Sequence, residues 1–154
     1  MSRTFTLDEA NALIPRVIAS FARTTQLVAA ARRIAQRLAA AGVRPPAPGQ
    51  LPEPASVAHD PALGAELALA TTLAETALAE ARALEALGIV VRDIERGLVD
   101  FRSVLDGQRE VWLCWQLGER EIRFWHDLDT GFVGRQPIEG HRFFRARQLV
   151  APRG

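Results

Sequence analysis

The first part of the chain carries apolar residues at the spacing of one helix face. These residues are Leu13, Val17, Phe21, Val28, Ile34 and Leu38. Thr6 and Glu9 form a capping box, in which each side chain accepts a hydrogen bond from the backbone amide of the other residue. Gly42 supplies a helix stop. The pattern therefore predicts a helix over residues 7–41.

A second helical pattern begins at Asp60-Pro61, which suit the N-cap and the first helical position. Its small and apolar residues alternate by four and three, the spacing of an antiparallel helix-packing seam. They are Leu63, Leu67, Ala70, Ala74, Ala77, Ala81 and Leu84. With Gly88 as the stop, we expect a helix over residues 61–87 that packs against the first as a hairpin.

The stretch between these helices, residues 42–60, is rich in proline. Five of the nine prolines fall within it, and Pro61 follows directly. Such a composition is typical of an extended, mobile connector that buries little apolar surface. We therefore expect the fold to survive removal of residues 44–58. A PxxP-type docking peptide is the alternative interpretation.

After the second helix the hydrophobic period changes to two, which is typical of strands. Asp106-Gly107 is a strong hairpin signal, because a type I′ turn needs positive φ at both central positions. Gly118-Glu119 is a second turn signal. We expect an antiparallel meander within residues 89–128, with a short lead-in strand at 89–91 and strands at 98–105, 109–117 and 121–128.

The turn signals also predict which side chains share a face of this sheet. Two loop residues at the first turn place Asp100 opposite Leu113. Either loop length considered for the second turn places His126 on the same face as Asp100, and we expect the helices to cover that face. The opposite face gathers Phe101, Trp112, Cys114 and Trp125. Side chains of this size need a cover of their own.

These elements define an α+β fold: a long antiparallel helical hairpin packed on a small three- to four-stranded antiparallel β-sheet. With 154 residues, the chain is long enough for one core, so we expect a single domain over residues 1–154. The C-terminal segment, residues 129–154, either docks as a final strand or forms a basic arm. Docking is favoured, because adjacent Phe143 and Phe144 rarely sit free in solvent.

Composition places the chain among ordinary globular proteins, with 48% hydrophobic and 24% charged residues. A net charge of +1 provides no global field for nucleic acid or membranes. The single Cys excludes an intramolecular disulfide and fits a reducing compartment. The N-terminus has no apolar signal region, and we expect no apolar run long enough to span a bilayer. We therefore expect a cytoplasmic protein without a membrane partner.

Asp100 and His126 are the best acid–base or metal candidates, because a carboxylate beside an imidazole fixes the tautomer and raises the basicity. Arg135 could fold back from the following loop and bind an anion. Two ligands are too few for zinc, which takes three or four protein ligands, so no metal or other cofactor is predicted. A buried, satisfied Asp–His–Arg network is the alternative interpretation of the same residues.

Two further polar residues are excluded from this site on geometric grounds. Cys114 could act as a nucleophile beside His126, but strand parity puts the two on opposite faces, so a packed apolar thiol is the simpler interpretation. Glu119 lies at the hairpin tip, seven residues before His126. Along an extended strand this separation is about 20 Å.

Four stretches stand out as motifs: FTLDEANALIPRV, GLVDF, VWLCWQLGE and FWHDLDTGFVGRQPI. Together they resemble the bacterial family called domain of unknown function 2203. The resemblance covers nearly the whole chain apart from the Pro-rich connector and the tail. It departs from the family pattern at Arg102, where a Pro is expected after GLVDF. It implies a small bacterial cytosolic protein, and it brings no activity, substrate or catalytic residue.

Three functional hypotheses follow. The preferred one is a non-enzymatic interaction or accessory protein that forms a homodimer through Phe101, Trp112 and Trp125 and could also bind another protein. The second is a small-molecule or metal-binding protein, or a hydrolase-like enzyme, centred on the Asp–His–Arg cluster. The third is nucleic-acid binding through the Arg- and Phe-bearing tail, which the near-zero net charge and the lack of a recognition motif disfavour.

Overall fold

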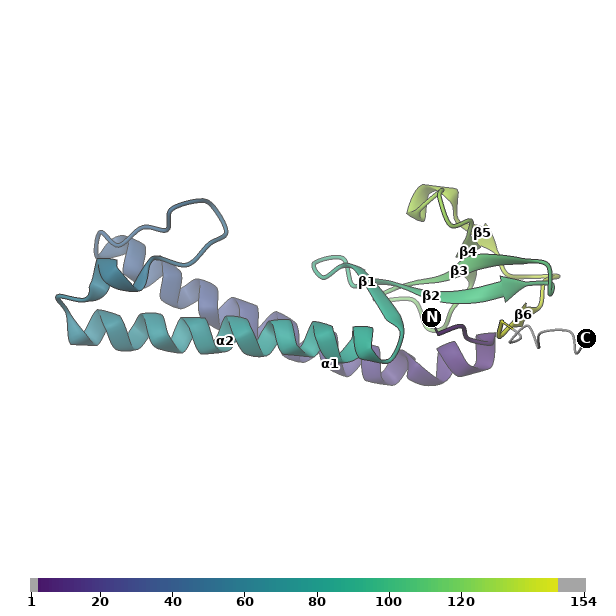
Figure 1. Ribbon diagram of the computed structural model, residues 1–154, viewed down its shortest axis with the longest axis horizontal. Coiled ribbons are helices and arrows are strands. Elements are labelled where there is room, and N and C mark those ends of the chain that lie inside the picture. Colours follow the sequence, from purple (N-terminus) through teal and green to yellow (C-terminus); the bar gives the residue numbers. More distant parts are fainter. Residues whose placement is uncertain (1–2, 147–154) are drawn as a thin grey trace, which may run out of the picture. The chain divides into compact units, whose positions relative to one another are not determined.

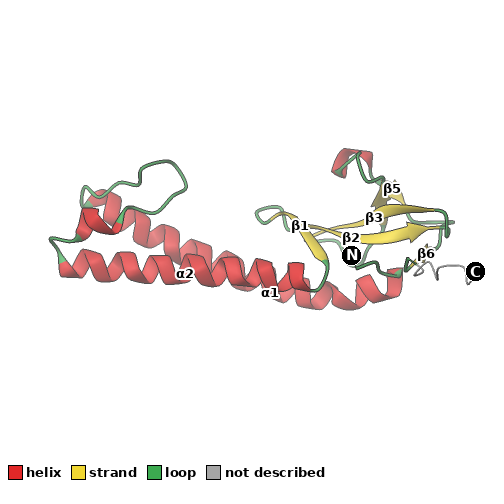
Figure 2. Ribbon diagram, in the orientation of Figure 1, coloured by secondary structure: helices red, strands yellow, loops and turns green. Residues whose placement is uncertain are grey.

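The computed structural model of the protein describes residues 3–146. In this part of the chain, long helices and an antiparallel sheet give an α+β fold, as the sequence predicted (Figure 1, Figure 2). The chain divides into two compact units, one formed by residues 20–82 and the other by the described parts of residues 1–19 and 83–154. Helix α1 (Leu7–Ala40) and helix α2 (Pro61–Ala86) each contribute to both units.

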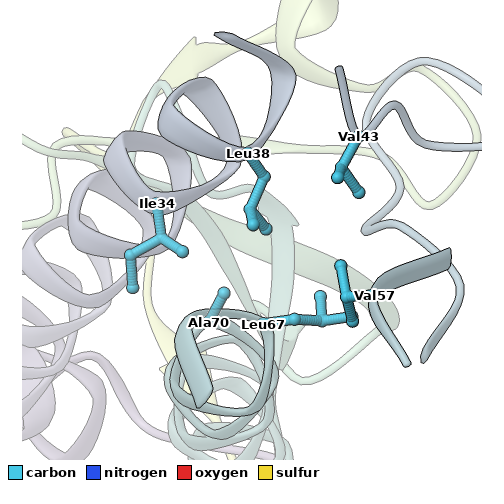
Figure 3. Packing of buried hydrophobic residues seen from close by; sticks show 6 residues of the cluster. All are labelled: Ile34, Leu38, Val43, Val57, Leu67 and Ala70. Carbon is cyan, nitrogen blue, oxygen red and sulfur yellow. The ribbon is translucent and has the colours of Figure 1, made fainter. Parts of the chain in front are cut away.

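In residues 20–82 the two helices share an apolar cluster. Its buried members are Ile34, Leu38, Val43, Val57, Leu67 and Ala70 (Figure 3). The seam predicted for α2 is confirmed here, because Leu67 and Ala70 are both buried. The helices are also joined by charged side chains, since Arg23 donates to Glu80 through Nε at 2.7 Å. Packing of the predicted seam, supported by this ion pair, therefore holds the hairpin together.

The segment between the helices is packed rather than free. Its 3-10 helix η1 (Pro54–Val57) places Val57 in the apolar cluster with 4% exposure, and Val43 joins from the other end of the segment. Leu51 packs against the same cluster. The expectation that the connector has little apolar surface to bury is therefore wrong. A few apolar residues between the prolines are sufficient to anchor it to both helices (Figure 3).

Helix α2 is long and apolar enough to cross a membrane, by length and composition alone. An 18-residue stretch of it has a mean hydropathy of 1.2, and 17% of that stretch is buried. This corrects the expectation that no apolar run reaches such a length. Its many alanines and leucines produce the value. The seam residues Leu67 and Ala70 are buried, whereas Leu69 and Leu78 on the other side of the helix are about half exposed.

The second unit is built on an antiparallel sheet with the path β1-β2-β3-β4-β5, and β6 pairs with β2 (Figure 1). The strands are β1 (Ile89–Asp93), β2 (Leu98–Leu105), β3 (Arg109–Gln116), β4 (Phe124–His126), β5 (Gln136–Pro137) and β6 (Phe143–Phe144). With six strands, the sheet is larger than the three- to four-stranded sheet predicted. The two-residue strands are too short to produce a visible alternation in the sequence.

The first hairpin differs by one residue from the predicted register. Asp106 and Gly107 have the positive φ angles of the expected turn, 52° and 73°. However, Leu105 pairs with Arg109 rather than with Gln108. Gln108 is therefore an additional residue that shifts β3 by one position against β2. A shift of one residue exchanges the two faces of a strand.

The register between β3 and β4 is shifted as well, because residues 117–123 form a longer connection than the expected tight turn. Cys114 lies opposite Phe124 on one side and opposite Asp100 on the other. The two shifts cancel between β2 and β4, so Asp100 and His126 share a face as predicted. They do not cancel for β3, and Cys114 therefore joins the face of Asp100.

The opposite face of the sheet carries the core of this unit. Its buried side chains include Phe101, Val111, Leu113, Trp115 and Trp125. Phe5 packs edge-on against Phe101, with ring centroids 5.3 Å apart. Asn11 of α1 accepts a hydrogen bond from the Ile122 amide at 2.8 Å. The N-terminal segment thus packs on this face and not, as expected, on the face of Asp100.

The C-terminal segment docks on the sheet as far as it is described. Strand β6 pairs with β2, and Arg145 forms an ion pair with Glu9 in the capping box of α1. The docking prediction is confirmed for these residues. Residues 147–154, which complete the predicted basic tail, lie outside the described residues.

Candidate metal centre

Three side chains with metal-binding atoms meet on one face of the sheet: Asp100 from β2, Cys114 from β3 and His126 from β4. One ligand atom of each lies within 4.8 Å of the other two. All three residues are buried, with exposures of 2%, 0% and 2% respectively. Cross-strand neighbours on one face approach each other closely, so the observed register is what creates the cluster.

His126 faces hydrogen-bond acceptors at both ring nitrogens. Nε2 lies 3.1 Å from each carboxylate oxygen of Asp100, and Nδ1 lies 2.8 Å from the Asp127 carbonyl oxygen. Burial lowers the pKa of His126, but the hydrogen bonds to Asp100 and Asp127 outweigh it and raise the pKa above its ordinary value. A neutral imidazole has one N–H and satisfies one acceptor, whereas the imidazolium satisfies both.

Cys114 is a protonated thiol at neutral pH. Burial, and then the charge of Asp100, raise the pKa of this thiol to about 12. A thiol with that pKa is a poor nucleophile at neutral pH. The sequence argument that kept Cys114 away from His126 is nevertheless wrong, because both lie on the Asp100 face. The third potential ligand was missed through the register of the first hairpin.

Arg92 is the charged residue that contacts the cluster from strand β1. Its Nε donates to Asp100 Oδ2 at 2.9 Å, and its guanidinium lies 4.8 Å from the ring centroid of Trp112. The Arg92 side chain is 43% exposed, in contrast to the carboxylate that it binds. Sequence reasoning missed Arg92 because it ended the lead-in strand at residue 91, whereas β1 continues to Asp93.

Arg135 supports the centre from the side of Cys114 rather than binding Asp100 or His126. Its Nη2 lies 2.6 and 2.9 Å from the two Glu119 carboxylate oxygens and 3.4 Å from the Cys114 carbonyl oxygen. The guanidinium also lies over the Phe124 ring, 4.1 Å from its centroid. Glu119, excluded from the site on sequence grounds, therefore reaches the backbone of Cys114 through Arg135.

The three aromatic residues expected to form one exposed surface lie on two different faces. Phe101 and Trp125 are buried in the core, with exposures of 0% and 2%. Trp112 lies on the face of the metal-ligand cluster, with the guanidinium of Arg102 5.4 Å from its ring centroid. The predicted dimer surface of Phe101, Trp112 and Trp125 is therefore absent from the described residues.

A family model described as "Uncharacterized conserved protein (DUF2203)" matches residues 3–138. The chain belongs to this family. The match covers the three residues of the cluster and also Arg92, Glu119 and Arg135. No curated protein and no solved structure matches the chain. The description of the family names no activity, so the function of this DUF2203 member has to be argued from its geometry.

In this DUF2203 member a cavity of about 400 Å³ lies next to the cluster on the same face of the sheet. Its lining includes Val90, Arg102 and Trp112. Val90 is the cross-strand partner of Asp100, and Trp112 that of His126. The indole Nε1 of Trp112 is buried and has no hydrogen-bond partner among the described residues. The cavity therefore places an aromatic side chain beside the strand position of His126.

Proposed function

We propose that the chain is a metal-binding protein that holds one divalent transition-metal ion, preferentially zinc, between Asp100, Cys114 and His126. The observation that carries this proposal is the convergence of three buried ligand atoms of different types within 4.8 Å. Carboxylate, thiolate and imidazole are all common zinc ligands, and the thiolate disfavours magnesium and calcium.

The distances suit a small ion. Zinc bonds of about 2.0–2.3 Å place the ligand atoms of a tetrahedral site about 3.3–3.8 Å apart. The Nε2 atom of His126 lies 3.1 Å from both carboxylate oxygens of Asp100, so an ion requires this gap to open only slightly. Because the three ligand atoms lie within 4.8 Å of one another, binding would require the side chains to close by at most about 1 Å.

Metal binding also provides partners for both nitrogens of His126. A neutral His126 that donates from Nδ1–H to the Asp127 carbonyl presents the Nε2 lone pair to the ion. A backbone carbonyl is a frequent outer partner of metal-bound histidines, because it fixes the tautomer and the ring orientation. The same geometry disfavours a general-base role, since neither nitrogen is free to take a proton from a substrate.

The state of Cys114 adds a pH dependence to this proposal. The thiolate is the form that binds metal, so loading the centre displaces the thiol proton. Because burial raises the pKa of the Cys114 thiol to about 12, the proton is held firmly until an ion replaces it. Metal affinity is therefore expected to increase as the pH rises.

Metal content and cobalt spectroscopy test the proposal. We expect the purified full chain to bind one zinc ion, measured by inductively coupled plasma mass spectrometry after dialysis. Cobalt replacing zinc should give a thiolate-to-metal charge-transfer band in the near ultraviolet. Cys114→Ser should remove that band, and His126→Gln should weaken cobalt binding at least about tenfold, as loss of outer-sphere partners alone costs about 10–100-fold.

His141 provides the matched control. It also contacts a carboxylate, with Nδ1 2.8 Å from Asp106 Oδ2, but this pair is partly exposed and has no thiol beside it. His141→Gln should leave metal content and the cobalt spectrum unchanged. Cobalt bound without a thiolate band, or the same loss in His141→Gln as in His126→Gln, would contradict the proposed centre.

The two other hypotheses receive less support from the described residues. Self-association remains a proposal, but its reason has weakened because Phe101 and Trp125 lie in the core of the protomer. For nucleic-acid binding, the described arginine nearest the C-terminus, Arg145, is already paired with Glu9. The geometry therefore favours the metal centre.

A further inference from the structure

We infer that the metal centre binds a small organic anion, a carboxylate or a phosphate ester, at an open coordination position, with Arg92 recognising the anionic group. This inference rests on the proposed metal centre. It also draws on the number of ligands, the balance of charge around them and the cavity beside Trp112.

The number of ligands leaves room for an exogenous one. Among the described residues the cluster supplies three ligand atoms, one each from Asp100, Cys114 and His126. Zinc is usually four-coordinate, and sites with three protein ligands keep the fourth position for water or a substrate atom. A structural site would instead be closed by a fourth side chain. The centre therefore has the composition of a reactive or ligand-binding site.

The charges favour an anion at that position. A zinc ion with charge +2, the Asp100 carboxylate and the Cys114 thiolate sum to zero. The guanidinium of Arg135 is balanced by Glu119, which it contacts at 2.6 Å. Arg92 is then the cation whose charge is not balanced. The Asp100 carboxylate that it contacts would share its negative charge with the ion. Metal loading thus leaves a surplus cation beside the open position.

Arg92 is well placed to receive the anion. Among the described residues it is bonded to the cluster through Nε alone, at 2.9 Å from Asp100. Its side chain is 43% exposed, so its other N–H groups are accessible from solvent. A guanidinium offers donors in a planar fork that matches a carboxylate or a phosphate. The same side chain can therefore contact Asp100 and an incoming anion.

The adjacent cavity selects an organic rather than an inorganic anion. Its volume of about 400 Å³ lies in the range of small-molecule sites, about 300–1,000 Å³. Trp112 lines it, and Arg92 stacks on the Trp112 ring at 4.8 Å. Arg92 and the three ligands are not among the lining residues, so the cavity meets the centre only through Trp112. Leu87 and Val90 add apolar side chains to the same lining. A planar apolar body next to the acidic group fits this lining.

Anion titrations of the cobalt-loaded full chain test the inference. The probes are acetate and benzoate, and inorganic phosphate and phenyl phosphate, followed through the visible bands of cobalt. We expect saturable spectral shifts, with the aromatic member of each pair binding at least about tenfold more tightly because it buries an apolar ring. Comparing the carboxylate pair with the phosphate pair identifies the preferred acidic group.

Substitutions separate the role of Arg92 from a general effect of charge. Arg92→Gln should weaken every anion at least about tenfold, as expected for loss of a charge-assisted hydrogen bond, and Arg92→Lys should restore part of the affinity. Arg123→Gln is the control, because Arg123 is exposed and paired with Glu121 away from the cluster. It should leave all four affinities unchanged. Circular dichroism and cobalt stoichiometry verify that each variant is folded and loaded.

The outcomes distinguish this inference from the proposed function. A thiolate band without any anion effect would overturn the anion site and leave the metal centre standing. Equal affinities in Arg92→Gln and the unmodified chain would also overturn it. Tighter binding of the inorganic or non-aromatic probes would exclude the cavity as the binding place. The absence of the thiolate band would remove the metal centre, and the anion site with it.

Discussion

At the scale of single residues, Asp100 holds the candidate centre together. Its carboxylate is 2% exposed, and it accepts hydrogen bonds from Arg92 Nε while lying against His126 Nε2. A buried charge is stable only when its partners remain in place, because removal of one partner leaves the other buried and unpaired. The protein therefore depends on Asp100 for stability, and the proposed metal centre would depend on it for coordination.

Asp100→Asn should lower the free energy of unfolding of the metal-free protein by about 3 kcal/mol. The amide retains the volume of the carboxylate but turns a donor toward His126 or Arg92. Urea titration monitored by circular dichroism measures the change. Asp106→Asn is the matched control, since Asp106 makes the same type of contact with His141 at an exposed position. Similar losses in the two variants would contradict the role given to Asp100.

At the scale of secondary-structure elements, hydrophobic periodicity predicts the helices and long strands but not the strand register. Each helix has one apolar face, so its boundaries and seam can be read from the sequence. In β3, Trp112 and Trp115 point to opposite faces, and large apolar residues therefore occupy both. The alternation of apolar residues is therefore compatible with either face of β3 pointing into the core. The additional residue Gln108 at the turn determines which face does so.

The candidate site was only partly predictable for the same reason. Asp100 and His126 could be paired because errors at two successive turns cancel across three strands. Cys114 could not be assigned, because it lies on the strand between those turns. Arg92 and Glu119 approach the cluster through tertiary contacts that have no local signal in the sequence. The sequence therefore predicted the pairing of Asp100 with His126. It missed Cys114, whose face depends on the strand register, and it missed Arg92 and Glu119, whose long side chains make tertiary contacts.

The capping box of α1 gives a prediction on acid stability. The hydrogen bond from Arg145, and then that from the Thr6 amide, lower the pKa of Glu9 from 4.5 to about 2. The carboxylate therefore stabilises the fold above pH 4.5, and this contribution is lost as the pH falls toward 2. Glu9→Gln should cost about 1 kcal/mol or less at neutral pH and should reduce the acid-induced loss of stability.

Unfolding in urea at several pH values between neutral and strongly acidic measures this effect. Glu121→Gln is the control, because Glu121 belongs to an exposed ion pair with Arg123 at 3.8 Å and caps no helix. That variant should keep the acid-induced loss of the unmodified protein. If Glu9→Gln followed the same pH curve as the unmodified protein, Glu9 would not be the group responsible.

At the scale of the whole molecule, the candidate centre and the apolar cluster of the connector belong to different compact units. The centre lies in the unit formed by residues 1–19 and 83–154, and the cluster lies within residues 20–82. Substitutions at sites that share no partner act independently to a good approximation. Stability of the helical hairpin and metal binding are therefore expected to respond to separate substitutions.

Val57→Ala should destabilise residues 20–82 by about 2 kcal/mol, because it removes buried methyl groups from the apolar cluster. Hydrogen exchange followed by mass spectrometry should show faster exchange in peptides from this unit, with an unchanged cobalt spectrum. Val133→Ala, at a valine that is 97% exposed, is the matched control and should change neither readout. Equal effects of both substitutions would show that Val57 is not anchored.

Replacement of residues 44–58 by a short Gly/Ser linker should also destabilise the hairpin unit, in contrast to the expectation from composition. The replacement removes Leu51 and Val57 from the cluster. Thermal unfolding followed by circular dichroism measures the loss. An unchanged melting temperature would show that the connector contributes nothing, as the proline content alone had indicated.

The three candidate ligands come from different strands, and this origin would have a consequence for synthesis of the chain on the ribosome. Asp100 and Cys114 face each other across one hairpin, which can close as soon as β3 has been made. His126 emerges later and completes the centre. A nascent chain would thus hold an ion first by two ligands and then by three, and the ion would favour correct docking of β4 over competing pairings.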